Sequence, residues 1–124
     1  MLMLSVGGLV GTPMLSSNSA TKGAVRLLAK SSAANGIRVN SVHPGITATG
    51  LWNKIGPLDA NGRNTPTEPH ELARTVALDV PAKPREIAAA LLFLASDASS
   101  YVTGSEVVVD GSMTAGMAAR RARP

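Results

Sequence analysis

Three short, mostly apolar runs, each followed by glycine or proline, constrain what this chain can fold into. They are residues 1–5 (MLMLS), 37–42 (IRVNSV) and 105–109 (SEVVV). Such runs are typical of strands that are buried on both faces, as in a parallel sheet. The turn signals that follow them are Gly7-Gly8, His43-Pro44-Gly45 and Asp110-Gly111. The pattern therefore predicts three strands of one sheet.

Helix-length segments separate the predicted strands. The sequence predicts helices over residues 18–34, 67–79 and 85–96, and a mobile loop rich in Gly, Pro, Asn and Asp over residues 50–66. Strands that alternate with helices predict an α/β fold with a parallel sheet and right-handed crossovers. At 124 residues the chain suits a single domain.

The first predicted helix carries the clearest local signals. Ser16 and Ser17 are candidate N-caps, and Asn35-Gly36 is a C-terminal signal. Steps of three and four residues predict one buried stripe, formed by Ala20, Ala24, Leu27, Leu28 and Ser31.

Composition excludes several classes of function. Aromatic residues are 2% of the chain, which argues against nucleic-acid binding by base stacking. There is no cysteine and there are two histidines, so no metal site is expected. No apolar run reaches membrane-spanning length, and the first residues lack a basic region typical of a signal peptide, so we expect a cytoplasmic protein. Residues 114–124 hold three of the arginines and are interpreted as a basic flexible tail; a polyanion-binding arm is the alternative.

Four motifs occur together in one order. They are Ser5 at the end of the first run, Asn18-x-x-x-Lys22, GIRVNSVHPG at 36–45 and SDASSYVTGSEVVVDG at 96–111. Over residues 1 to about 116 the chain resembles the short-chain dehydrogenase/reductase family, in particular its hydroxysteroid- and alcohol-dehydrogenase-like members. The resemblance implies an incomplete, Rossmann-type doubly wound sheet, with residues 1–113 as the C-terminal half of that domain. It also implies hydride transfer between NAD or NADP and a small-molecule alcohol or ketone.

The resemblance implies three catalytic positions. Ser5 stands where the family has a serine that hydrogen-bonds the substrate oxygen, and Lys22 where it has a lysine that binds the cofactor ribose. A spacing of four puts residues 18 and 22 on one helix face. Asn18 stands where the family has its tyrosine, the general acid. Because an amide has no proton that titrates near neutral pH, Asn18 predicts impaired proton transfer.

The resemblance also implies the cofactor and substrate contacts. Besides Lys22, the cofactor positions are Pro44, Gly45, Ile46, Thr47 and Thr49, where Ile46 contributes its backbone. The substrate positions, besides Ser5, are Leu51 and Trp52, in a lid that spans residues 50–80. The family's glycine-rich loop for the cofactor pyrophosphate has no counterpart in this sequence.

Three hypotheses stay open from the sequence. The first is an oxidoreductase, truncated and impaired at Asn18. The second is a non-catalytic binding or assembly protein that forms a homo-oligomer or pairs with a full-length relative. The third is a chain with no independent fold, because half of a doubly wound sheet exposes an apolar edge strand. Tyr101, the single tyrosine, belongs to a structural block, and His43 is interpreted as a loop-packing residue.

Overall fold

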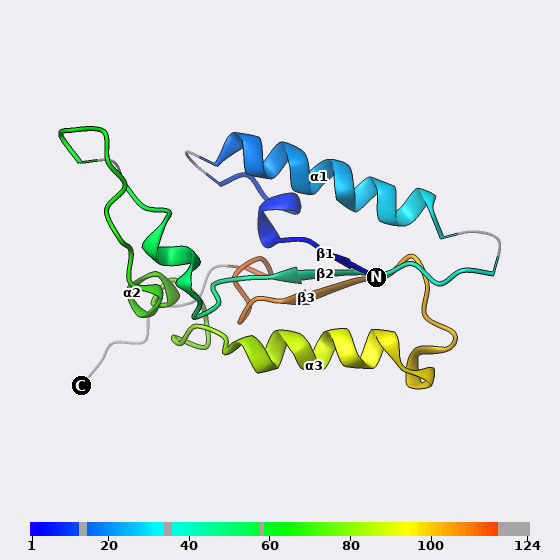
Figure 1. The fold of residues 1–124 in the computed structure, drawn as a ribbon. Coiled ribbons are helices and arrows are strands. Elements are labelled where there is room, and N and C mark those ends of the chain that lie inside the picture. The colour runs from blue at the N-terminus through cyan, green and yellow to red at the C-terminus, as the bar shows by residue number, and fades with distance from the viewer. Residues whose placement is uncertain (13–14, 34–35, 58, 117–124) are drawn as a thin grey trace.

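A three-stranded parallel sheet lies between two helices in the computed structural model, which describes residues 1–12, 15–33, 36–57 and 59–116 (Figure 1). The strand order is β1 (Leu2–Met3), β2 (Ser41–Pro44) and β3 (Glu106–Val109). Helix α1 (Ser16–Ser31) covers one face of the sheet and α3 (Pro84–Ala95) covers the other. The α/β prediction with a parallel sheet is confirmed.

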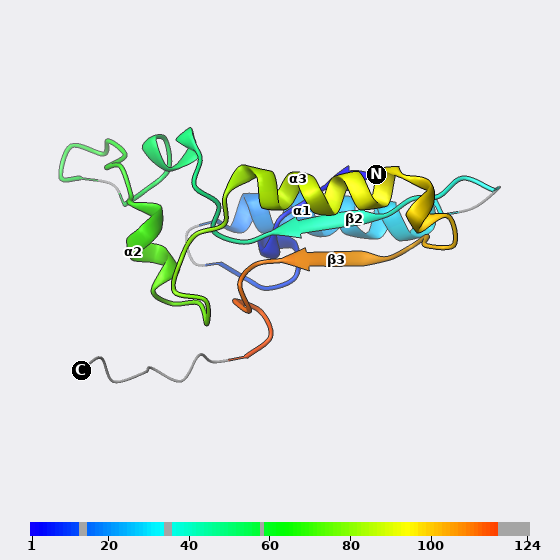
Figure 2. The same ribbon diagram turned by 90° about the horizontal axis from the view of Figure 1, so that it is seen from below.

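The shorter elements gather around the strand ends. The 3-10 helix η1 (Val6–Gly8) follows β1, and η2 (Gly50–Asn53) and α2 (Pro69–Ala73) lie beyond the carboxyl end of β2 (Figure 2). A third 3-10 helix, η3 (Asp97–Ser99), follows α3 at the opposite end of the sheet. In the part of the chain that the structure describes, no helix is long and apolar enough to cross a membrane.

The middle strand begins four residues later than predicted. Strand β2 includes His43 and Pro44, which the sequence pattern treats as a stop. The N–H groups of Ser41 and Gly45 donate to β3, so the Pro44 nitrogen faces the β1 side. Strand β1 pairs with β2 only as far as Val42. Because no β1 residue lies opposite Pro44, the missing N–H of the proline costs no hydrogen bond between the strands.

The first helix also differs from its prediction. It begins at Ser16, its N-cap is Leu15, and no side chain caps it, so Ser16 and Ser17 are not its caps. It ends at Ser31 instead of residue 34. Of the predicted C-terminal signal Asn35-Gly36, Asn35 lies outside the described residues, and Gly36 has a left-handed backbone with a φ of 75°.

The predicted buried stripe of α1 is wrong. All five of its members are exposed, with Leu27 at 67% and Leu28 at 54%. The buried side instead carries Ala29 at 2%, together with partly buried Gly23 and Arg26. Ala29 packs against the rest of the fold, and a partly buried ion pair with Glu106 holds Arg26 on this side. These contacts outweigh the periodicity of the leucines.

The other predicted helices need smaller corrections. Helix α2 is five residues long, much shorter than the 67–79 prediction, and the chain after it forms turns. Helix α3 begins one residue before its prediction, with Pro84 in its first turn, where a missing N–H costs nothing. The Glu86 carboxylate accepts a hydrogen bond from the Lys83 backbone N–H at 2.7 Å and so caps the N-terminus of α3. Thr114, the first residue of the predicted tail, donates to Asp110, and residues 117–124 lie outside the described part.

Two arginines connect the layers. The Arg38 guanidinium donates to the Leu94 carbonyl at 3.1 Å and the Ser99 hydroxyl at 2.9 Å, so it satisfies acceptors at the C-terminus of α3. Arg26 on α1 donates to both carboxylate oxygens of Glu106 on β3, at 2.5 and 3.0 Å. Lys30 adds a contact of 3.3 Å to the same carboxylate.

Glu106 predicts how stability depends on pH. Its hydrogen bond from Arg26 lowers the pKa of Glu106 from 4.5 to about 2. A carboxyl with a lowered pKa stabilises the fold above its ordinary pKa, and that stabilisation is lost as the pH falls from 4.5 towards 2. We expect Glu106→Gln to lower the free energy of unfolding by about 1 kcal/mol at pH 7, and the difference from wild type to vanish near pH 2.

Urea unfolding across this pH range measures the effect. The matched control is Glu71→Gln, because Glu71 forms an ion pair with Arg74 at 3.0 Å in which both side chains are well exposed. The control should change little at any pH. Equal effects of the two substitutions at pH 7 would contradict the structural role of Glu106.

Candidate active-site cleft

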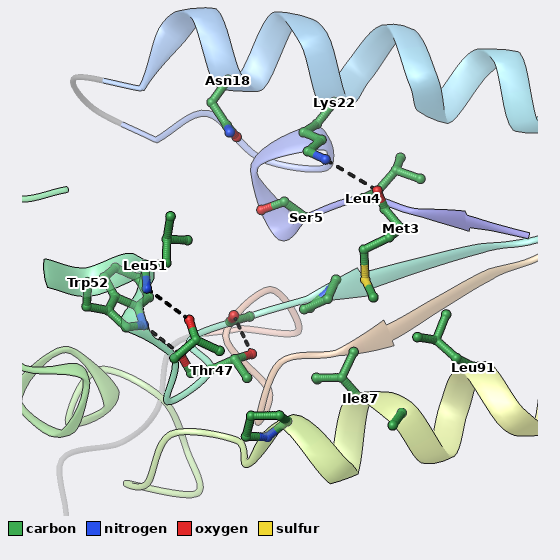
Figure 3. Close-up of a pocket in the computed structure, with 15 residues that line it drawn as sticks. Met3, Leu4, Ser5, Asn18, Lys22, Thr47, Leu51, Trp52, Ile87 and Leu91 are labelled. Atoms are coloured by element: carbon green, nitrogen blue, oxygen red, sulfur yellow. Dashed lines mark hydrogen bonds between the residues drawn. The ribbon is translucent and has the colours of Figure 1, made fainter. Parts of the chain in front are cut away.

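A cavity of about 560 Å³ opens where β1 and β2 end, between α1, η2 and the start of α3 (Figure 3). Its volume lies within the usual range for a small-molecule site. It brings together nearly all of the residues that the sequence singles out: Ser5, Asn18, Lys22, Pro44, Gly45, Thr47, Thr49, Leu51 and Trp52. Four apolar side chains that the sequence does not indicate, Met3, Leu4, Ile87 and Leu91, add to the lining. Strand polarity could have indicated Leu4, whereas the α3 residues come from a crossover that local patterns do not reveal.

Ser5 is held at the point where β1 turns into η1. Its backbone is extended, and its Oγ accepts the Gly7 N–H at 3.1 Å as the cap of η1. Its carbonyl accepts the Gly8 N–H at 3.0 Å and also contacts Nδ1 of His43 at 3.2 Å. The cap bond uses a lone pair of the hydroxyl oxygen, so the hydroxyl proton can be donated to a ligand in the cleft.

Asn18 and Lys22 project from α1 towards η1 and the end of β1 (Figure 3). A Cβ on Gly7 would lie 3.2 Å from Asn18 Oδ1 and 3.5 Å from Ser5 Oγ, so these two polar groups flank one glycine. Lys22 Nζ donates to the Met3 carbonyl at 3.3 Å. The predicted serine, asparagine and lysine positions therefore share one wall of the cleft.

Gly7 and Gly8 allow this wall to form. A Cβ on Gly8 would lie 3.0 Å from the backbone carbonyl of Lys22, closer than real Cβ contacts usually are. The sequence marks the Gly7-Gly8 pair only as the end of a strand. A pair of glycines between a strand and a helix is a signal of close backbone approach that could have indicated this packing.

The loop after β2 forms the opposite wall. The Thr47 hydroxyl donates to the Gly45 carbonyl at 3.2 Å, and the Thr47 carbonyl accepts Nε1–H of Trp52 at 2.6 Å. Thr49 Oγ1 accepts the Leu51 N–H at 3.4 Å and caps η2. These bonds tie the loop to the segment that carries Leu51 and Trp52.

Ile46 is the predicted site residue that does not line the cleft. Its side chain is buried with Ala73 and Val76, and its carbonyl accepts the Ala82 N–H at 2.9 Å. The Ile46 side chain therefore makes no contact in the cleft, and the predicted contact of its backbone with the cofactor stays a prediction. Tyr101, fully exposed, precedes β3 at the amino end of the strands, opposite the cleft, and cannot replace the acid.

Comparison with known proteins identifies the family. The family model described as enoyl-(acyl carrier protein) reductase matches residues 2–114. The chain belongs to the short-chain dehydrogenase/reductase family. A cyclopentanol dehydrogenase from Comamonas testosteroni is 46% identical over 115 residues, which are 90% of this chain and 43% of that protein.

Other relatives agree. A 3-alpha-(or 20-beta)-hydroxysteroid dehydrogenase from Mycobacterium tuberculosis is 42% identical and is covered to 40% of its length by 92% of this chain. The crystal structure of a short chain dehydrogenase family protein from Francisella tularensis has a TM-score of 0.76 and 30% identity, and 91% of this chain covers 49% of it. The chain thus spans less than half of the length of each of these relatives.

The cleft of this short-chain dehydrogenase/reductase chain fits the nicotinamide end of the cofactor that the family implies. Gly45 lets the backbone pass close to Asp110, and Thr47, Thr49 and Lys22 supply polar groups around an otherwise apolar cavity. A planar, partly polar ring beside a ribose suits such a lining. The motifs recognised in this sequence include none for the adenine end of the cofactor.

Gly45 gives a direct test of the close approach that shapes the cleft. A Cβ at this position would lie 2.7 Å from both Cα and Cβ of Asp110, and neither atom can move away without its backbone. We expect Gly45→Ala to destabilise the fold by about 1–3 kcal/mol through overpacking.

Thermal unfolding of Gly45→Ala measures this effect. The matched control is Gly50→Ala in the same loop, because a Cβ on Gly50 meets no atom within 4 Å. The control should unfold close to wild type. Equal unfolding temperatures of the two variants would contradict the contact between the β2 and β3 ends.

Proposed function

We propose that this chain is part of a cytoplasmic NAD- or NADP-dependent oxidoreductase that acts on a secondary alcohol or ketone, and that Asn18 impairs its proton-transfer step. The observation that supports the proposal is the convergence of Ser5, Asn18 and Lys22 on one wall of the cleft. The names of two relatives, a cyclopentanol dehydrogenase and a hydroxysteroid dehydrogenase, support a secondary alcohol. The apolar lining by Met3, Ile87 and Leu91 suits an alicyclic substrate.

Each residue has a defined task in this proposal. A bound nicotinamide supplies or accepts the hydride. The Ser5 hydroxyl donates to the substrate oxygen, since its cap bond leaves its proton available. Lys22 Nζ, now on the Met3 carbonyl, supplies the positive charge beside the ribose. Asn18 donates a hydrogen bond but no proton, a loss that costs about 10²–10⁴ in rate.

Lys22 predicts the cofactor affinity. A charged hydrogen bond contributes about 1.5–3 kcal/mol, so we expect Lys22→Met to weaken NADH or NADPH binding by about tenfold or more. Fluorescence titration of the nucleotide measures it. The control is Lys54→Met, which removes the same charge from an exposed side chain outside the cleft lining. Equal affinity of the two variants would refute the assignment of Lys22.

Asn18 predicts the activity. We expect the chain to reduce cyclopentanone with NADH or NADPH at a rate close to background, and Asn18→Tyr alone not to restore turnover, because the sequence has no glycine-rich loop for the pyrophosphate. Absorbance of the reduced nicotinamide measures the rate. Clear turnover by the single variant would show that this loop is dispensable. Turnover by the wild-type chain would overturn the proposed impairment.

A non-catalytic assembly role is the second candidate, and the exposed face of α1 favours it. Leu27 and Leu28 are well exposed there, and Met3 on the edge strand is 48% exposed. Neighbouring exposed apolar residues such as Leu27 and Leu28 are typical of association surfaces. Light scattering on the purified chain tests this role: we expect a dimer or larger species that Leu27→Lys with Leu28→Lys dissociates. A monomeric wild-type chain would exclude self-association.

A further inference from the structure

A buried histidine lies directly behind the end of β1. His43 on β2 has no exposed surface, and its two ring nitrogens contact different segments. Nδ1 lies 3.2 Å from the carbonyl oxygen of Ser5, and Nε2 lies 3.1 Å from the hydroxyl of Ser41. The expectation that His43 packs in a loop is therefore wrong: the residue belongs to the central strand.

The two contacts determine which nitrogen carries the proton. A carbonyl oxygen can only accept, so the contact with Ser5 requires a proton on Nδ1. The neutral ring then has a lone pair on Nε2. The Ser41 hydroxyl has a single proton and two acceptors in reach, Nε2 at 3.1 Å and the Ser105 carbonyl at 3.3 Å, and this tautomer assigns the proton to the nearer Nε2. Burial lowers the pKa of His43 below its ordinary 6.5, which agrees with a neutral ring at pH 7.

The backbone leaves Ser5 without a partner strand at this point. The last hydrogen bond between the two strands joins the Leu4 N–H to the Val42 carbonyl at 2.8 Å. Beyond it the chain turns into η1, and the Gly8 N–H is the backbone donor to the Ser5 carbonyl. The imidazole of His43 reaches the same carbonyl from β2 and so continues the strand contact with a side chain.

We propose that His43 is a positioning residue for Ser5. The Nδ1–H of His43 and the N–H of Gly8 hold the Ser5 carbonyl, while the N–H of Gly7 holds its hydroxyl oxygen, and together they direct the hydroxyl proton into the cleft. The inference rests on the proposed role of Ser5 towards substrate. Its test measures the protonation of the His43 ring and the hydrogen exchange of backbone amides. The outcome is therefore independent of cofactor binding and turnover.

The wild-type chain provides the first measurement. Nitrogen-15 NMR of the ring distinguishes the two neutral tautomers, and we expect the Nδ1–H form at pH 7. A ring protonated only on Nε2 could not donate to the Ser5 carbonyl and would overturn the proposal. This measurement needs no variant and therefore decides the point even where a substitution prevents folding.

Three substitutions separate positioning from packing. In His43→Asn the side-chain amide nitrogen lies at about the position of Nδ1, and in His43→Gln at about the position of Nε2. The His43→Leu variant keeps a side chain of similar size but has no hydrogen-bond donor. The readout is hydrogen exchange at the Gly7 and Gly8 amides, relative to the Gly45 amide, which donates to Val109 on β3. Loss of one net hydrogen bond predicts exchange about fivefold faster in the leucine variant.

The pattern across the variants decides the outcome. His43→Asn should return the exchange of Gly7 and Gly8 to near the wild-type rate, and His43→Gln should not. Unchanged exchange in His43→Leu relative to Gly45 would overturn the proposal. Equal rescue by asparagine and glutamine would also overturn it, because polarity alone would then suffice. If cofactor titration fails while this pattern holds, the positioning contact stands and the proposed reaction does not.

Discussion

The hydrogen-bonded pairing of β2 with both neighbouring strands is the constraint on which the cleft depends. Its register pairs residues 41–44 with β3 but only Ser41 and Val42 with β1, so the pairing with β1 ends two residues earlier. At that step the chain after β1 turns into η1 while β2 continues to Pro44, and the cavity opens at this difference in length. The close approach of Gly45 to the Asp110 backbone fixes the point where the chain leaves β2, just before Thr47 and Thr49, which line the cavity. A change in strand register would move both walls of the cleft.

Much of the fold could be predicted because apolar runs and their glycine or proline stops are local features. The number, order and parallel direction of the strands followed from them. Strand boundaries did not, because Pro44 is tolerated only through the early end of β1, which is a tertiary fact. The face of α1 was misassigned for a related reason. Its leucines have helical periodicity, but the side that faces the fold carries Ala29, which is buried, and Arg26, which forms an ion pair with Glu106.

Long-range polar contacts account for most of what the sequence did not indicate. Glu106 meets Arg26 across 80 positions of chain, and Arg38 meets Leu94 across 56. Neither pair has a local pattern, since each joins a helix to a strand or a loop that only the crossover brings near. The cleft residues were found through motif order, which carries such long-range information indirectly. Ile46 and His43 show its limit, because a motif names a position without saying whether its side chain faces the cavity or the core.

The same separation applies to Asn18. The wall that contains it is built by glycines: Gly7 fits between Asn18 and Ser5, and Gly8 fits against Lys22. None of these contacts requires the residue at position 18 to ionise, so an amide there leaves the fold and the shape of the cleft intact. Proton transfer as we propose it depends, in contrast, on that one group, because the amide holds no proton to give. Geometry and chemistry therefore have different determinants in this chain, and a cleft with its serine and lysine in place is compatible with the loss of the reaction for which its family is named.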